Sequence, residues 1–287
     1  MANDDELQDH DRGLSFDLST LMSRRRALTL LGGASLAVAG CSSGSGGSAS
    51  NGPTTKSVTT TAPASTAPPT AAITAAHVPP NTRIPYEIAG PSAIDGSTGP
   101  NVLTDSGILR RDIRSSFGGP TGVAKGVPAT VDFTVLDVAN GDRPYQGAAV
   151  YLWQCDRDGL YSLYDQPIHQ QNYLRGVQVA DGDGRVSFTS IFAGAYATRW
   201  PHLHLEVYKD IATATAGGNI VKTTQIALPE AACQAVYATP GYEQSARLLP
   251  QTPLSQDLAF KDGYALQMTT ATGDVKSGYT ISLDLPV

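Results

Sequence analysis

The sequence lacks the features that mark proteins which bind nucleotides or nucleic acids or span a membrane. It contains no glycine-rich phosphate loop, no dinucleotide fingerprint and no internal repeat. Charged residues make up 16% of the chain, the formal net charge is -6, and no basic stripe is present, which argues against a nucleic-acid partner. The apolar stretch at residues 27–40 is shorter and richer in glycine than the about 20 apolar residues of a membrane-spanning helix.

The N-terminal region has the order of an export signal. Met22-Ser-Arg-Arg-Arg26 precedes a short apolar run and small residues, and its arginines resemble a twin-arginine signal. Val38-Ala-Gly-Cys41 resembles a bacterial lipobox, which makes Cys41 the predicted lipidation site. We therefore expect residues 1–41 to be a signal region of an exported bacterial lipoprotein, at the cell surface or in the periplasm, with a lipid anchor as its membrane contact. A cytosolic N-terminal helix with a chance cysteine is the alternative.

Composition divides the rest of the chain in two. Residues 42–81 are mostly Ser, Thr, Pro, Ala and Gly, a composition that cannot bury apolar surface, so we predict a disordered linker there. Residues 82–287 are long enough for one domain with a sizeable core.

Short strands between Gly, Pro and Asp turns predict that this domain is an all-β sandwich, preceded by an irregular strap at residues 82–120. Helical patterns are confined to 103–116 and 229–236. The predicted strands are Thr130–Val138, Ala148–Trp153, Arg185–Ile191, Leu203–Tyr208, Val221–Leu228, Tyr264–Thr269 and Gly278–Leu285.

Histidine is scarce, and two of the five histidines stand one residue apart, as His202 and His204. In a strand both would project from one face, about 6.6 Å apart along the chain, close enough to bind one metal ion. The alternative is a pair of surface residues. A third ligand could come from His77, His169, Glu206 or Cys155, but a phenolate from Tyr196 is favoured, because a hard anionic oxygen suits a trivalent cation such as Fe(III).

Cysteine is also scarce. If Cys41 is lipidated, Cys155 and Cys233 remain as an even pair in an oxidising compartment, which predicts a disulfide between them. Two buried free thiols are the alternative.

Several segments together resemble the intradiol ring-cleavage dioxygenases, a family that includes protocatechuate and catechol dioxygenases. These segments are Tyr151–Tyr161, Tyr173–Phe188, Gly194-Ala-Tyr196 and Arg199-Trp-Pro-His-Leu-His204. The resemblance covers roughly residues 82 to 287 and implies a prealbumin-like β-sandwich core.

The resemblance also implies a ligand set and a reaction. Tyr161, Tyr196, His202 and His204 would hold one non-haem Fe(III) ion, Tyr196 would also accept a substrate proton, Arg199 would stabilise negative charge on the ring, and Gln225 would donate a hydrogen bond. The substrates would be a catechol-type aromatic diol and O2, and the product a cis,cis-muconate-type diacid. A non-catalytic β-sandwich binding module on a surface lipoprotein is the alternative, and the oligomeric state is left open.

Overall fold

The computed structural model describes residues 81–97 and 99–287. The predicted signal region, the lipidation site Cys41 and the predicted linker up to residue 80 lie outside the described residues. Within the described part of the chain, no helix combines the length and apolar character needed to cross a bilayer.

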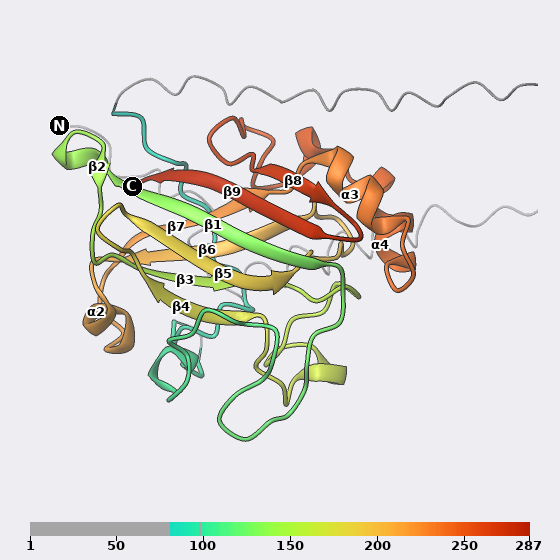
Figure 1. The fold of residues 1–287 in the computed structure, drawn as a ribbon, viewed down its shortest axis with the longest axis horizontal. Coiled ribbons are helices and arrows are strands. Elements are labelled where there is room, and N and C mark those ends of the chain that lie inside the picture. Colours follow the sequence, from blue (N-terminus) through green and yellow to red (C-terminus); the bar gives the residue numbers. More distant parts are fainter. Residues whose placement is uncertain (1–80, 98) are drawn as a thin grey trace, which may run out of the picture. The chain divides into compact units, whose positions relative to one another are not determined.

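The first of two sheets has five strands, in the order β2-β1-β9-β8, and β5 pairs with β1 along the edge opposite β9 (Figure 1). β1 pairs in parallel with β9 and antiparallel with β5, so it lies at the centre of the sheet. The strands are β1 (Pro128–Asp137), β2 (Arg143–Pro144), β5 (Arg185–Ile191), β8 (Thr270–Asp274) and β9 (Gly278–Pro286).

The second sheet has four antiparallel strands in the order β4-β3-β6-β7. Its strands are β3 (Ala149–Trp153), β4 (Arg175–Val179), β6 (His202–Tyr208) and β7 (Ile220–Ala227). All residues of β3 and β6 are buried, because one face packs on the first sheet and the other is covered by loops and by the chain before β1.

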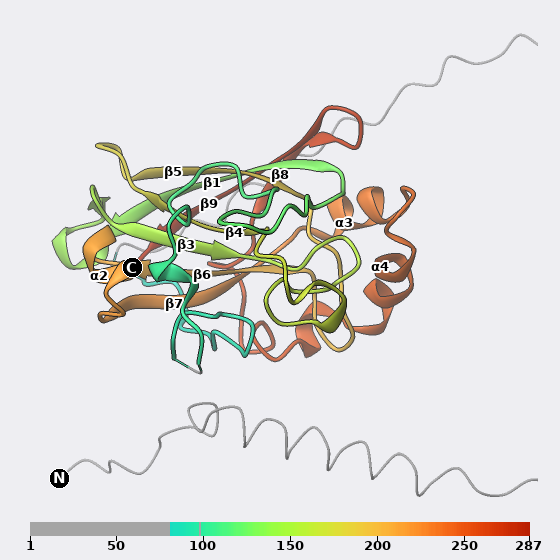
Figure 2. The same ribbon diagram turned by 90° about the horizontal axis from the view of Figure 1, so that it is seen from below.

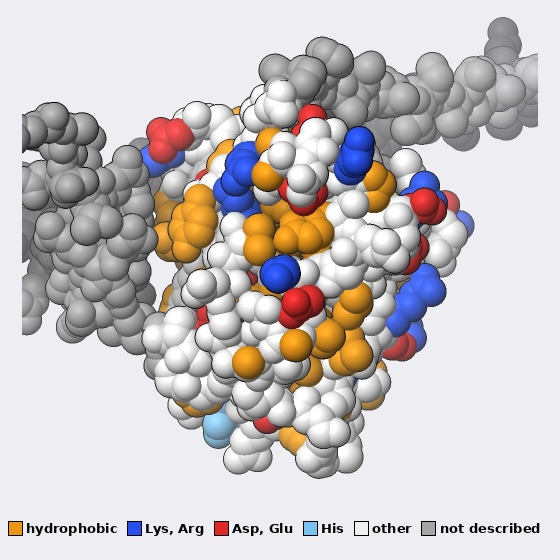
Figure 3. Space-filling view, turned by 90° about the vertical axis from the view of Figure 1, so that its left-hand side faces the viewer, with side chains coloured by type: hydrophobic (Ala, Val, Ile, Leu, Met, Phe, Trp, Pro, Cys, Tyr) orange, Lys and Arg blue, Asp and Glu red, His pale blue; other side chains and the backbone are white. Residues whose placement is uncertain are grey.

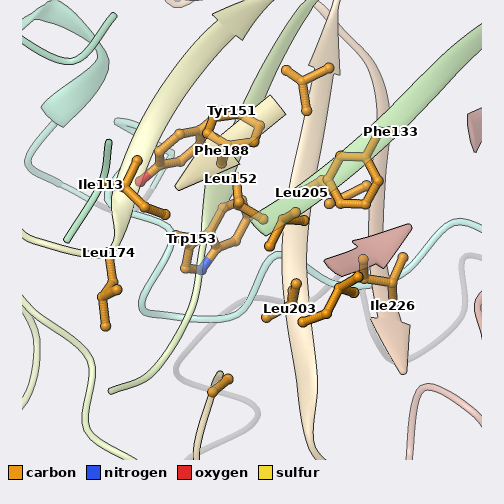
Figure 4. Close-up of a cluster of buried hydrophobic side chains, with 14 of the residues drawn as sticks. Ile113, Phe133, Tyr151, Leu152, Trp153, Leu174, Phe188, Leu203, Leu205 and Ile226 are labelled. Atoms are coloured by element: carbon orange, nitrogen blue, oxygen red, sulfur yellow. The ribbon is translucent and has the colours of Figure 1, made fainter. Parts of the chain in front are cut away.

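The core lies between the two sheets. In β1, Val131, Phe133 and Val135 alternate with partly exposed residues and point towards the second sheet, the period of a strand with one buried face. Figure 4 shows side chains from both sheets meeting there, and it labels Ile113, Phe133, Tyr151, Leu152, Trp153, Leu174, Phe188, Leu203, Leu205 and Ile226. The predicted β-sandwich is confirmed.

The helices are short and lie at the ends of the sandwich. In both ribbon views α3 and α4 lie together at one end and α2 lies at the other (Figures 1 and 2). The α-helices are α2 (Ile211–Thr215), α3 (Glu230–Tyr237) and α4 (Glu243–Leu248), and the 3-10 turns are Val102–Thr104, Val138–Asn140, Gln166–Ile168, Leu249–Gln251 and Leu254–Gln256.

Two of the predicted elements are wrong. The helix predicted at 103–116 is limited to the 3-10 turn Val102–Thr104, because the chain beyond it forms isolated bridges, Leu109 to Val177 and Asp112 to Thr189. The strand predicted at 264–269 is a turn, in which the Tyr264 carbonyl accepts two backbone N–H groups, and β8 begins only at Thr270. The other predicted strands and the helix at 230–237 are confirmed.

The structure also corrects the predicted disulfide, since Cys155 and Cys233 are both buried free thiols. The Cys155 thiol donates instead to the Gly194 carbonyl, 3.5 Å away. Cys233 lies on α3, one turn before Tyr237, and burial raises the pKa of both thiols.

The face of the molecule drawn in Figure 3 carries charges of both signs. Lys and Arg side chains lie interspersed with Asp and Glu side chains there, and apolar groups lie between them.

Candidate metal centre

The pairing of β3 with β6 decides where the candidate site lies. The two strands are antiparallel, and Trp153 at the end of β3 pairs with His204 near the start of β6. The loop that follows β3 and the loop that precedes β6 therefore meet at the same end of the sheet. The Trp153 ring stacks on the His204 ring with centroids 4.9 Å apart, which fixes the plane of the imidazole.

His202 and His204 project from one face of β6, and both are almost fully buried, at 1% and 3% exposure. Their Nε2 atoms lie 3.0 Å apart. The Nδ1 atom of His202 lies 2.5 Å from the Trp200 carbonyl. A carbonyl can only accept, so this contact assigns the proton to Nδ1 and leaves the Nε2 lone pair facing His204.

Tyr161 and Tyr196 come from the two loops, which touch backbone to backbone. Gly159 adopts a left-handed φ of +78°, and a Cβ there would lie 2.5 Å from the Ala195 carbonyl oxygen. Across the same contact, a Cβ on Gly194 would lie 2.5 Å from the Arg157 carbonyl oxygen. The two glycines thus allow the close approach that brings the tyrosines together.

The four side chains form a closed ring of contacts. Tyr196 Oη lies 3.0 Å from His202 Nε2, His204 Nε2 lies 3.0 Å from Tyr161 Oη, and the two phenol oxygens lie 3.5 Å apart. With the contact between the imidazoles, four atoms spaced in this way can all lie roughly 2.2 Å from a common point, close to the length of a bond between a metal ion and nitrogen or oxygen.

Protons alone do not account for this ring. If His202 carries its proton on Nδ1, the ring contains two phenol hydrogens and at most one hydrogen on His204 Nε2. Three hydrogens cannot supply four separate hydrogen bonds. A cation at the centre would be approached by all four lone pairs at once, so the donor set fits a metal ion.

Electrostatics favour the neutral imidazole that a metal ligand requires. Burial lowers the pKa of His202 and of His204 well below the usual value, and the Arg199 charge lowers both further. Burial raises the pKa of Tyr161 well above its usual value and that of Tyr196 to about 12, with Arg199 opposing the rise at Tyr196. Without a cation both phenols therefore stay protonated at neutral pH, and binding a cation as phenolates would release their protons.

Arg199 and Gln225 lie beside the ring. Arg199 Nη1 is 3.4 Å from Tyr196 Oη, and its Nη2 donates to the Gln225 side-chain oxygen. Gln225 pairs with His204 across β6 and β7, and its Nε2 donates to the Ile88 carbonyl at 2.8 Å. The chain before β1 therefore closes over the site.

Sequence reasoning missed Asp257 and Gln267. Asp257 is fully buried and accepts two hydrogen bonds from Arg199, while Gln267 donates to the Gln225 carbonyl and to Glu87. Neither residue stands in a recognisable motif. Burial raises the pKa of Glu87 to about 7, although the hydrogen bond from Gln267 opposes the rise.

The other candidate ligands do not join the ring. His169 is exposed, and its ring contacts the Gln166 carbonyl. Glu206 accepts a hydrogen bond from Tyr208, and the Cys155 thiol donates to Gly194, while His77 lies outside the described residues. Among residues 81–97 and 99–287, no group of three or more His, Cys, Asp or Glu side chains is placed to hold a metal ion, so this centre depends on its tyrosines.

Comparisons with known proteins agree with the β-sandwich fold. A family model described as Dioxygenase matches residues 99–213, which include all four side chains of the ring. A comparison with curated proteins gives no match.

Two solved dioxygenases share this fold. The intradiol ring-cleavage dioxygenase from Tetranychus urticae is 24% identical, with a TM-score of 0.52 over 63% of this chain and 87% of that chain. A second solved dioxygenase is 25% identical, with a TM-score of 0.51 and the same coverage. Hydroxyquinol 1,2-dioxygenase from Pseudomonas putida DLL-E4 is 20% identical, with a TM-score of 0.40 over 63% of this chain and 62% of that chain. The chain is therefore similar to dioxygenases in residues 99–213 and shares its fold with a solved intradiol ring-cleavage dioxygenase.

Replacing Gly159 by alanine should open the contact between the two tyrosine loops. Its φ of +78° disfavours a Cβ, and the Ala195 carbonyl occupies the space. We expect a loss of about 1–3 kcal/mol in the free energy of unfolding, measured by urea denaturation. Gly182→Ala is the matched control, since a Cβ there meets nothing within 4 Å. Equal stability of the two variants would contradict the role assigned to this contact.

Replacing Glu87 by glutamine should change how stability depends on pH. The pKa of about 7 in the folded protein lies above the ordinary value of 4.5, so the folded state binds this proton more tightly than the unfolded state. Its stabilising effect is complete below pH 4.5 and is lost as the pH rises through 7. Glu87→Gln should therefore gain stability relative to the natural protein between these values, whereas Asp284→Asn, at an exposed position, should not. Parallel curves for Glu87→Gln and the natural protein in pH-dependent urea unfolding would refute this assignment.

Proposed function

We propose that the protein is a non-haem Fe(III) dioxygenase that cleaves catechol-type rings between the two hydroxylated carbons. The observation that carries this proposal is the closed ring of Tyr161, Tyr196, His202 and His204, whose donor atoms lie 3.0 to 3.5 Å from their neighbours. Two phenolates balance two of the three charges of a ferric ion, and hard oxygen donors suit that ion.

The four side chains would act as the ligands. A ferric ion held there would withdraw electrons from a bound catechol and so would make its ring reactive towards dioxygen. The products would be cis,cis-muconate-type diacids that contain both atoms of O2.

The residues around the ring have separate tasks. Tyr196 is the only one of the four that is partly exposed, so its phenolate is the one placed to accept a proton from an incoming catechol. Arg199 lies beside it and offers a fixed positive charge to the oxygens and to the negative charge that develops on the ring. Gln225 holds Arg199 on one side and the Ile88 carbonyl on the other.

Colour and oxygen uptake test the function together. Charge transfer from tyrosinate to Fe(III) should give the iron-loaded protein a burgundy colour, and catechol should cause oxygen uptake with formation of the ring-opened diacid. A panel of catechol, methylcatechols, hydroxyquinol and protocatechuate would define the accepted ring. An iron-loaded sample that is colourless and inactive would favour a non-catalytic binding module.

The ligand assignment is tested in the same assay by Tyr161→Phe and His204→Ala. Each variant removes one donor atom from the ring and should lose bound iron, measured by metal analysis, together with the visible band and ring cleavage. Tyr164→Phe and His169→Ala are the matched controls, because both residues are exposed and lie outside the ring. Ring cleavage retained in either ligand variant would contradict the assignment.

We also propose that the protein is an exported bacterial lipoprotein, on the strength of the arginine cluster at 24–26 and the lipobox at 38–41. Replacing Cys41 by alanine should remove the lipid acceptor and move the protein from the membrane fraction to the soluble fraction of its host. Unchanged fractionation and mass in the variant would refute lipidation at this cysteine.

A further inference from the structure

The contacts of Arg199 point to a residue outside the ligand motif that the reaction would need. A guanidinium group has five N–H donors in a rigid plane. Arg199 donates Nε–H to Asp257 Oδ2 at 2.9 Å and one Nη2–H to Asp257 Oδ1 at 3.2 Å. Its other Nη2–H faces Gln225, so only the Nη1 corner is left towards Tyr196 Oη.

Asp257 is itself held in place. It lies at the end of the 3-10 turn Leu254–Gln256 and is 0% exposed. Its two oxygens also accept the backbone N–H groups of Trp200, at 2.7 Å, and Ala259, at 2.9 Å. Both carboxylate oxygens therefore have two donors each, and the carboxylate joins the segment after α4 to the loop that carries Arg199.

Charge gives a second reason for the pairing. The Arg199 and Asp257 side chains are 8% and 0% exposed, so a guanidinium without this partner would be a buried, uncompensated charge. A bidentate pair also fixes the plane of the guanidinium, which a single hydrogen bond does not.

We propose that Asp257 is a positioning residue for Arg199. It occupies one edge of the guanidinium, so that the opposite corner faces Tyr196 and a substrate bound beside it. This inference rests on the proposed ring cleavage for its kinetic consequence, but the geometry itself is independent of iron.

Kinetics test the consequence. In the natural protein each oxygen of Asp257 accepts hydrogen bonds from two N–H groups. In Asp257→Asn an amide NH2, itself a donor, replaces one of these oxygens, so Arg199 should lose its fixed plane. We expect kcat to fall about 10- to 100-fold, with a smaller change in KM and with iron content retained. Asp262→Asn is the matched control, an exposed acid in the same segment, and it should stay within about twofold.

A double-variant cycle separates positioning from general structural support. If Asp257 acts through Arg199, Arg199→Gln/Asp257→Asn should lose no more kcat than Arg199→Gln alone. Multiplied losses in the double variant would overturn the proposal, as would an Asp257→Asn protein whose kcat is unchanged.

A measurement on the natural protein without iron covers the case in which Asp257→Asn does not fold. The 15N-labelled protein should show an Arg199 Nε–H signal that exchanges slowly with water and is assigned by its loss in Arg199→Lys. A rapidly exchanging signal would overturn the inference. Natural protein that shows this slow signal but neither binds iron nor takes up oxygen would refute the proposed function and leave the inference standing.

Discussion

Two imidazole nitrogens and two phenol oxygens face one another in a buried space, and the rest of the structure is arranged to allow this. Lone pairs at 3.0 Å repel unless a proton or a cation lies between them, and the hydrogens of the ring are too few for its contacts. Such a cluster persists only if rigid elements hold it. His202 and His204 lie on β6, an interior strand paired on both sides, and the tyrosines lie on loops locked together at Gly159 and Gly194.

The electrostatic surroundings prepare the same four atoms for a cation. Two buried arginines act on the histidines, since Arg199 and, more weakly, Arg175 add to the effect of burial on the pKa of His204. Arg175 donates to neutral acceptors, among them the Ser162 hydroxyl and the Ser92 carbonyl. Positive charges nearby disfavour imidazolium and favour phenolate, and both effects leave lone pairs free for a metal ion.

The sequence was most informative where structure is local. Alternating or continuous apolar runs predicted six of the strands, and the spacing of His202 and His204 predicted that both face the same way from one strand. Other elements depend on distant partners. Residues 103–116 carry a helical pattern but form bridges with Val177 and Thr189, far along the chain. The expected oxidising compartment predicted a disulfide, but both cysteines are free thiols: Cys155 donates to the Gly194 carbonyl, and Cys233 lies on α3.

The same distinction separates the predictable part of the site from the rest. Tyr161, Tyr196 and the histidines all lie within residues 99–213, the part matched by the dioxygenase family model. Asp257 and Gln267 support Arg199 and Gln225 from the chain after α4, and Ile88 closes the site from the chain before β1.

These supporting contacts lie beyond residues 99–213, the part matched by the family model. Each consists of one or two hydrogen bonds, which segments of many different sequences and lengths could supply. The spacing of residues in the sequence therefore does not predict them. The matched segment therefore carries the four donor atoms, whereas the segments on either side of it decide how firmly Arg199 is held. A change in these outer segments can alter the position of Arg199 without displacing the ring, because none of the four donor atoms belongs to them.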